Sequence, residues 1–175
     1  MSELNTERLT LKKVTLQDAP ALFKVWSNPQ VTEFMNITPM MDVRQSYEMI
    51  NIFQRMDKSN QGNRFSIFES DQSKPIGSCG FNYIDTENDR GEIGYELSVD
   101  HWGKGYMTEA LTELVRYGFD HYKLNRIEAK VETQNQASQF LLKKLGFKQE
   151  GLLRSYEKSK GRYIDLAMFS ILKED

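Results

Sequence analysis

The sequence predicts one α/β domain in which helices flank a mixed, mostly antiparallel sheet. Segments with alternating apolar residues are interleaved with segments of helical spacing, in the order β-α-α-β-β-β-α-β-α-β-β. A strand, a helix and a second strand span residues 91–133, and such a crossover joins parallel strands. The 175 residues suffice for one core, and no linker or repeat divides them. We therefore expect about seven strands and about four helices in a single domain over residues 1–175.

The N-terminal third is expected to form one strand and two helices. Alternating apolar residues over 9–14 predict the strand. The segment Thr15-Leu16-Gln17-Asp18 has the form of a capping box, and an apolar helical face follows it until Pro29. Asp42 is placed to cap a second helix that runs to about Met56.

The remaining elements follow from the same two periodicities. Gly146 is expected to end a short helix, because glycine adopts the left-handed conformation that terminates helices. Hairpins at both ends of the chain should be antiparallel. After a loop at 58–63, the expected order is the strands 65–68, 76–84 and 91–99, a long helix over 107–122, a strand at 127–133, a short helix at 137–145, and the strands 147–157 and 163–172.

Composition excludes several classes of protein. The net charge of −2 argues against a nucleic-acid surface built on bulk charge. No apolar run approaches the roughly 20 residues that span a bilayer, and the polar N-terminus is unlike a signal peptide. Cys79 has no second cysteine to pair with, and two histidines provide no zinc-ligand cluster. We expect a cytoplasmic protein that binds neither membrane nor metal.

The stretch Gly91–Leu111 is the most informative part of the sequence. It reads as a strand, a turn containing Gly103 and Gly105, and the opening of a helix, whose free N–H groups suit a phosphate. A P-loop motif is missing, and Thr108 stands where a dinucleotide fingerprint needs its third glycine. Gly94 predicts a bulge in this strand, which would tilt it from its parallel neighbour and open a wedge. An amide-bearing arm in that wedge, with a pyrophosphate on the turn, describes coenzyme A.

With these residues in view, nearly the whole chain resembles the GNAT superfamily of acyl-CoA N-acyltransferases. The family signature Arg/Gln-x-x-Gly-x-Gly/Ala falls on Trp102–Met107 and departs at its first and last positions. Three further segments resemble the Rim-type branch, which acetylates the N-termini of ribosomal proteins: Arg8-Leu9-x-Leu11, Asn135-Gln136-Ala137-Ser138 and Gly161-x-Tyr163-x-Asp165. The resemblance implies the GNAT fold, with a parallel central pair of strands splayed by a bulge.

The resemblance also implies acetyl-CoA as cosubstrate, with no metal. Backbone groups of Leu97 and Val99 would bind the pantetheine arm, and Asn135 would contact the same arm. From the residues alone, Asn135 is also a plausible helix cap. The pyrophosphate would lie on Gly103, Lys104, Gly105, Tyr106, Met107 and Thr108.

Catalytic roles come from the resemblance as well. Many GNAT enzymes protonate the departing thiolate with a tyrosine, but that position here is Leu142. The Rim-type arrangement instead places Ser138 as the proton donor and Glu157 as the base. Water could replace Ser138, and Glu92 or Glu96, on the polar face of the central strand, could replace Glu157.

The function expected from these features is transfer of an acetyl group to a primary amine, most readily a protein N-terminal α-amine. One alternative is an acetyltransferase for a small amine such as a polyamine, an amino sugar or an amine antibiotic. Glu33, Asp42 and Glu48 could line an acidic pocket for a polyamine. Another alternative is a non-catalytic acyl-CoA-binding module. The sequence leaves the acceptor and a homodimer open.

Overall fold

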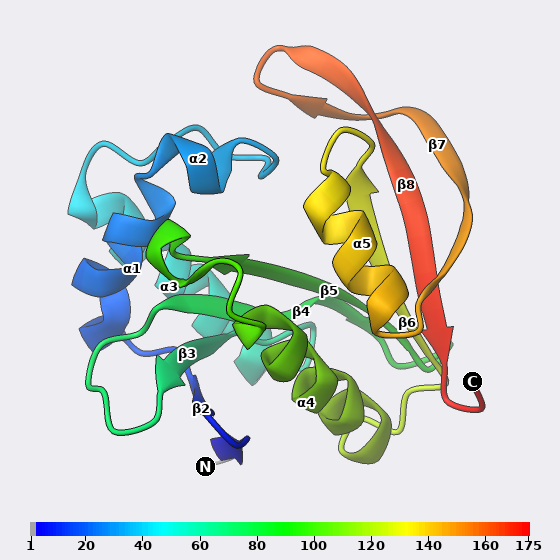
Figure 1. The fold of residues 1–175 in the computed structure, drawn as a ribbon, viewed down its shortest axis with the longest axis horizontal. Helices are drawn as coiled ribbons and strands as arrows, with labels where there is room; N and C mark the ends of the chain where they lie inside the picture. The colour runs from blue at the N-terminus through cyan, green and yellow to red at the C-terminus, as the bar shows by residue number, and fades with distance from the viewer. Residues whose placement is uncertain (1–2) are drawn as a thin grey trace.

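One eight-stranded sheet forms the centre of the computed structural model, which describes residues 3–175 (Figure 1). Its strand order is β1-β2-β3-β4-β5-β6-β8-β7, and β5 and β6 are its parallel pair. The strands are β1 (Glu3–Asn5), β2 (Leu9–Lys13), β3 (Phe65–Glu69), β4 (Gly77–Asp85), β5 (Arg90–Leu97), β6 (Arg126–Glu132), β7 (Lys148–Ser159) and β8 (Arg162–Leu172).

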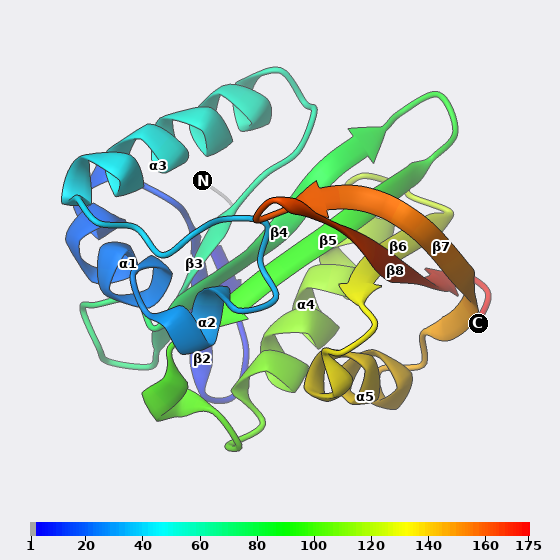
Figure 2. The same cartoon turned by 90° about the horizontal axis from the view of Figure 1, so that it is seen from above.

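Helices cover both faces of the sheet (Figures 1 and 2). Buried side chains of α4 and α5 pack on one face in the larger apolar core, while the helices that precede β3 form a second cluster. β1 and the short α2 were not predicted; every other element matches an expected one within a few residues. The helices are α1 (Ala19–Trp26), α2 (Pro29–Thr32), α3 (Val43–Lys58), α4 (Tyr106–Asp120) and α5 (Gln136–Lys144).

The predicted helix caps are confirmed. The Thr15 N–H donates to the Asp18 carboxylate at 2.9 Å, which completes the first capping box. Asp42 caps α3 by accepting the N–H of Arg44 at 2.8 Å. Gly146, at φ +92°, follows α5 in the left-handed conformation.

The parallel pair separates soon after it begins. β5 and β6 pair only from Arg90 opposite Arg126 to Glu92 opposite Glu128, and beyond that rung they diverge (Figure 1). The predicted wedge is therefore present. We call the Glu92–Glu128 rung its apex.

The bulge lies on a different strand from the one predicted. β4 carries an extra residue, Asn82, because Phe81 lies opposite Ile93 and Tyr83 opposite Glu92. Gly94, on the neighbouring strand β5, leaves room for the side chain of the bulged residue. A Cβ at Gly94 would lie 2.4 Å from the Asn82 side-chain nitrogen. Gly94 is thus needed for a close approach and is not itself the bulged residue.

A second correction concerns the end of the central strand. β5 stops at Leu97, and Val99 begins a single 3-10 turn, Val99–His101, that leads into the glycine turn. Within the described part of the chain, no helix combines the length and apolar character required to cross a membrane.

Candidate active site

The glycine turn opens α4 without a side-chain cap. Gly103 and Gly105 have φ of +73° and +78°, which glycine adopts without steric cost. Gly105 is the N-cap of α4, and no described side chain accepts hydrogen bonds from the first turn of the helix. A Cβ on Gly103 would meet nothing within 4 Å, so the turn is open to a ligand. Free N–H groups at a positive dipole end suit an anion.

Arg8, at the start of β2, fixes the shape of this turn. Its Nη1 donates to the Lys104 carbonyl at 2.8 Å, and its Nε donates to Glu109 in α4 at 2.7 Å. The guanidinium also lies over the Tyr106 ring, 4.6 Å from its centroid. The turn and the first turn of α4 are therefore held against the N-terminal strand.

The edge of β5 that faces the wedge offers backbone groups. The Ser98 N–H donates to Ile76 on the β4 side at 2.8 Å. Because backbone groups alternate in direction along a strand, those of Leu97 and Tyr95 point toward the wedge. The Trp102 indole donates to the Leu97 carbonyl at 2.8 Å, which confirms this direction. The Val99 carbonyl is engaged by the Trp102 N–H at 3.1 Å.

Asn135 and Ser138 lie together at the start of α5. The Asn135 side chain accepts the Ser138 N–H at 3.1 Å, so the expected capping role is confirmed. The Ser138 hydroxyl forms a hydrogen bond with the Tyr95 hydroxyl, across the wedge from β5. Burial raises the pKa of Tyr95 to about 12.

Glu157 lies near the tip of the β7–β8 hairpin and does not join this cluster. Its carboxylate accepts the Asn36 side-chain N–H at 2.8 Å. The same tip is held by Lys160, whose Nζ donates to the Thr32 and Glu33 carbonyls at 2.6 and 2.9 Å. The hairpin therefore reaches across the molecule to the segment after α2 (Figure 2).

The sequence placed Glu96 on the polar face of the central strand, but its side chain is covered and not exposed to solvent. It is 6% exposed and accepts hydrogen bonds from the Trp26 indole at 3.0 Å and from the Ser78 hydroxyl. Arg64 completes the network with an ion pair of 2.9 Å. A carboxylate with these partners is a poor candidate for a base, because taking up a proton would leave Arg64 as a buried unpaired charge.

Glu92 lies at the wedge apex, on the face away from α4 and α5. It forms an ion pair with Lys130 at 3.3 Å. Both side chains border a cavity of about 290 Å³ that also includes the other apex residue, Glu128. The full lining is Tyr83, Arg90, Glu92, Glu128, Lys130, Leu153, Tyr156 and Met168.

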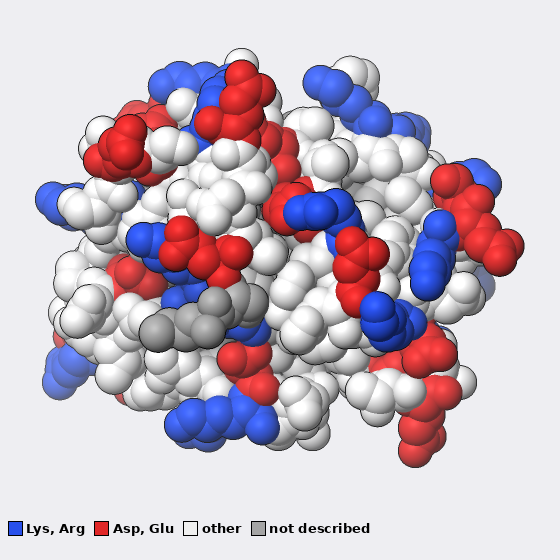
Figure 3. All heavy atoms as spheres, turned by 90° about the horizontal axis from the view of Figure 1, so that it is seen from below, with Lys and Arg blue, Asp and Glu red and all other residues white. Residues whose placement is uncertain are grey.

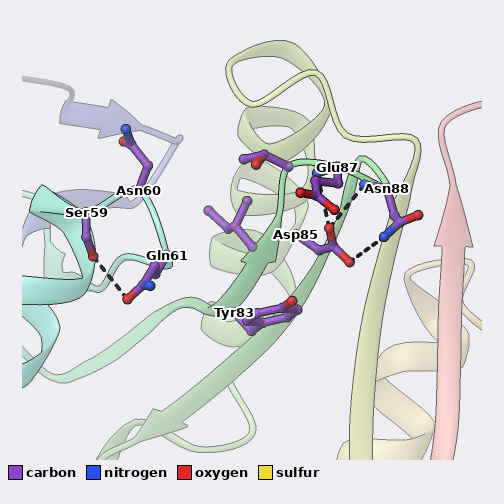
Figure 4. Close-up of a pocket in the computed structure, with 9 residues that line it drawn as sticks. Ser59, Asn60, Gln61, Tyr83, Asp85, Glu87 and Asn88 are labelled. Atoms are coloured by element: carbon purple, nitrogen blue, oxygen red, sulfur yellow. Dashed lines mark hydrogen bonds between the residues drawn. The ribbon is translucent and has the colours of Figure 1, made fainter.

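Another cavity, of about 510 Å³, lies by the β4–β5 turn, beyond the closed end of the wedge, and shares Tyr83 with the apex cavity (Figure 4). Its Asp85 carboxylate accepts the N–H groups of Glu87 and Asn88, each at 3.1 Å, and so stabilises the turn itself. On the face shown in Figure 3, basic and acidic side chains are interspersed.

Residues 8–148 match the family described as the acetyltransferase (GNAT) domain. The chain belongs to the GNAT acetyltransferases. It is 54% identical to the uncharacterized N-acetyltransferase p20 of Bacillus licheniformis, over 100% of this chain and 98% of p20. It is 29% identical to the [ribosomal protein uS5]-alanine N-acetyltransferase of Escherichia coli, over 98% of this chain and 91% of that enzyme.

Among solved structures, RimL, a ribosomal L7/L12 alpha-N-protein acetyltransferase in complex with coenzyme A, has the same fold. Its TM-score is 0.89 at 22% identity, over 98% of each chain. This GNAT chain is thus an acetyltransferase enzyme. The uncapped start of α4 and the open edge of β5 fit acetyl-CoA, the expected cosubstrate, because they offer donors to its phosphates and partners to its amides.

Three contacts in this GNAT site were missed by sequence reasoning. Tyr95 lay within the expected strand 91–99 without a role of its own, Arg8 belonged only to a motif, and Asn36 had no assignment. Each contacts a residue far away in the sequence, and no local pattern marks such a pair. The Leu142 side chain, which replaces the tyrosine of many relatives, is fully buried.

Proposed function

We propose that this enzyme transfers the acetyl group of acetyl-CoA to the α-amine of a protein N-terminus, with both substrates bound together. The observation that carries the proposal is the wedge with the uncapped start of α4 at its open end and a cavity of about 290 Å³ at its apex. Donor and acceptor can then meet through the gap between β5 and β6 from opposite faces of the sheet.

Residues of the turn would hold the donor. The backbone from Gly103 to Thr108 would bind the pyrophosphate, with Lys104 adding charge. Leu97 and the Val99 N–H would pair with the arm, and Asn135 would contact it while capping α5. Met107 packs partly buried against the apolar core, so its bulk stays out of the phosphate position.

The amine would attack the thioester carbonyl carbon directly. A Leu97 N–H would polarise the carbonyl oxygen. An α-amine has a pKa near 8, so roughly a tenth is neutral at pH 7, whereas only about one lysine amine in a few thousand is neutral. A modest base therefore suffices for an N-terminal acceptor. We assign this role to Glu157, directly or through water, with Glu92 at the apex as the alternative.

Departure of the thiolate needs little help, because a thiol has a pKa near 8.5. Ser138 is the group we assign to that help, and water is the alternative. The amine forms the C–N bond, the C–S bond breaks with its electron pair on sulfur, and the amine proton passes to the base.

The charges around the wedge support an N-terminal acceptor over a polyamine. The apex cavity contains two acidic and two basic side chains, whereas a polycation would favour unpaired acids. Asp42, expected in an acidic pocket, is paired with Arg44 at 2.7 Å. The similarity to enzymes named for ribosomal-protein N-termini points the same way.

A panel of acceptors tests the proposal. The enzyme is incubated with acetyl-CoA and one of three acceptors, and release of CoA thiol is measured. The acceptors are peptides with a free N-terminus, the same peptides with a blocked N-terminus and an internal lysine, and spermidine. We expect turnover with the free N-termini. Turnover confined to spermidine, or to no amine at all, would contradict the assigned acceptor or the transfer itself.

A further inference from the structure

Tyr95 and Ser138 bridge the wedge on the side of α4 and α5. Tyr95 belongs to β5, two residues before Leu97, and Ser138 belongs to the first turn of α5. Their hydroxyl groups are hydrogen-bonded to each other. At about 3.3 Å per residue, Tyr95 lies roughly 7 Å farther from the glycine turn than Leu97. An arm that starts at the turn and pairs with Leu97 would bring its far end, which carries the sulfur, to this pair.

The direction of the Tyr95–Ser138 hydrogen bond follows from acidity. A phenol, with a pKa near 10, is a stronger donor than an aliphatic hydroxyl. Burial raises the pKa of Tyr95 to about 12, so the phenol keeps its hydrogen at neutral pH. Because even this phenol is more acidic than an aliphatic hydroxyl, the order of acidity favours Tyr95 as the donor to Ser138 Oγ. The Ser138 hydrogen is then free to point elsewhere, and a chain of hydrogen bonds polarises it further.

Ser138 is also held through its backbone. Its N–H donates to the Asn135 side chain at 3.1 Å, which fixes the first turn of α5. Asn135 thus holds the Ser138 backbone and Tyr95 contacts its oxygen, which leaves the Ser138 hydrogen available to a group bound in the wedge.

We propose that Tyr95 is a positioning residue that aims the Ser138 hydroxyl at the sulfur of the departing CoA thiolate. This inference rests on the proposed function, because it requires the CoA arm in the wedge. As the C–S bond breaks, its electron pair stays on sulfur, and Ser138 stabilises that charge by donating a hydrogen bond. Tyr95 keeps its own proton throughout.

The chain offers a matched control in Tyr122. Its hydroxyl accepts from the Asn63 side chain at 2.9 Å, and its pKa is likewise raised, mainly by burial, to about 12. Tyr122 packs against Phe81 and Tyr117 and has no contact with Ser138. Tyr122→Phe thus removes a partly buried phenolic hydroxyl without touching the proposed pair.

The test measures binding of CoA by calorimetry from pH 7 to 10, beside S-ethyl-CoA, whose sulfur cannot ionise. A hydrogen bond to the thiolate lowers the thiol pKa on the enzyme, so CoA binding should tighten with pH relative to the thioether. We expect a gain of about tenfold in the wild type and in Tyr122→Phe. The gain should fall to about threefold or less in Tyr95→Phe and in Ser138→Ala.

Two kinetic results complete the test. Tyr95→Phe should lower kcat about fivefold while the KM for acetyl-CoA stays unchanged. The double variant should lose no more than Ser138→Ala alone, because Tyr95 acts through Ser138. A wild-type pH gain in Tyr95→Phe, no pH gain in the wild type, or additive losses in the double variant would each overturn the inference. Since the calorimetry uses CoA alone, failure of the acceptor panel is distinguishable from failure of this proposal.

Discussion

Replacing Gly105 by alanine tests the phosphate turn through the backbone alone. Gly105 has φ +78° and ψ 7°, and a residue with a Cβ adopts this conformation at a cost of about 1–2 kcal/mol. The added Cβ would lie 3.4 Å from Arg8 Nη2, the end of a flexible side chain, so the backbone cost dominates. The free turn can relax, but binding of phosphate must restore its shape. We therefore expect the affinity for CoA to fall about five- to thirtyfold.

Gly161→Ala is the control for this prediction. Gly161 has φ +81° in the β7–β8 turn, and a Cβ there would meet nothing within 4 Å. Gly161→Ala should lose a few degrees of melting temperature through its backbone cost, and Gly105→Ala no more than that, because its turn relaxes when no phosphate is bound. Calorimetric titration with CoA should weaken only for Gly105→Ala. Equal CoA affinities in the two variants would refute the assignment of the turn to the pyrophosphate.

Three further predictions concern other parts of the site. Glu157→Gln should lower turnover at least tenfold while CoA affinity measured by calorimetry stays nearly unchanged; full activity would remove Glu157 from the mechanism. Arg8→Ala should weaken CoA binding about fivefold by releasing the turn, yet change the melting temperature little, because its pair with Glu109 is partly exposed. The pKa values of Tyr95 and Tyr122 are raised to about 12, so each neutral phenol contributes to the free energy of unfolding. This contribution is fully present below pH 10 and is lost as the pH rises toward 12. Chemical denaturation at pH 9 and 11 should show a smaller loss in either Phe variant than in the wild type.

Much of the fold was predictable because its signals are local. The alternation of apolar residues found the long strands, and the capping boxes at Thr15 and Asp42 located two helix starts. The bulge was placed wrongly because it depends on the register between two strands. Gly94 indicated that two strands approach closely at this point, whereas Asn82, the extra residue, has no distinguishing local pattern.

The candidate site was predictable only where backbone conformation determines it. Gly103 and Gly105 indicated the turn because glycine adopts their positive φ without steric cost. Glu96 was assigned correctly to the polar face, but no periodicity in β5 could show that Trp26 covers it. The pair of Tyr95 with Ser138 is formed by packing between distant segments, so the sequence predicted Ser138 but neither Tyr95 nor the contact.

In the proposed reaction, the donor enters the wedge from the glycine turn and the acceptor reaches its apex from the opposite face. A crystal structure with a bisubstrate conjugate, in which an acetyl bridge joins CoA sulfur to the α-amine of a short peptide, tests this most directly. We predict the phosphates on Gly103–Thr108, the arm along Leu97, and the peptide leaving through the cavity that contains Glu92 and Glu128. A peptide that leaves on the α4 and α5 side, or phosphates bound elsewhere, would contradict this arrangement of donor and acceptor.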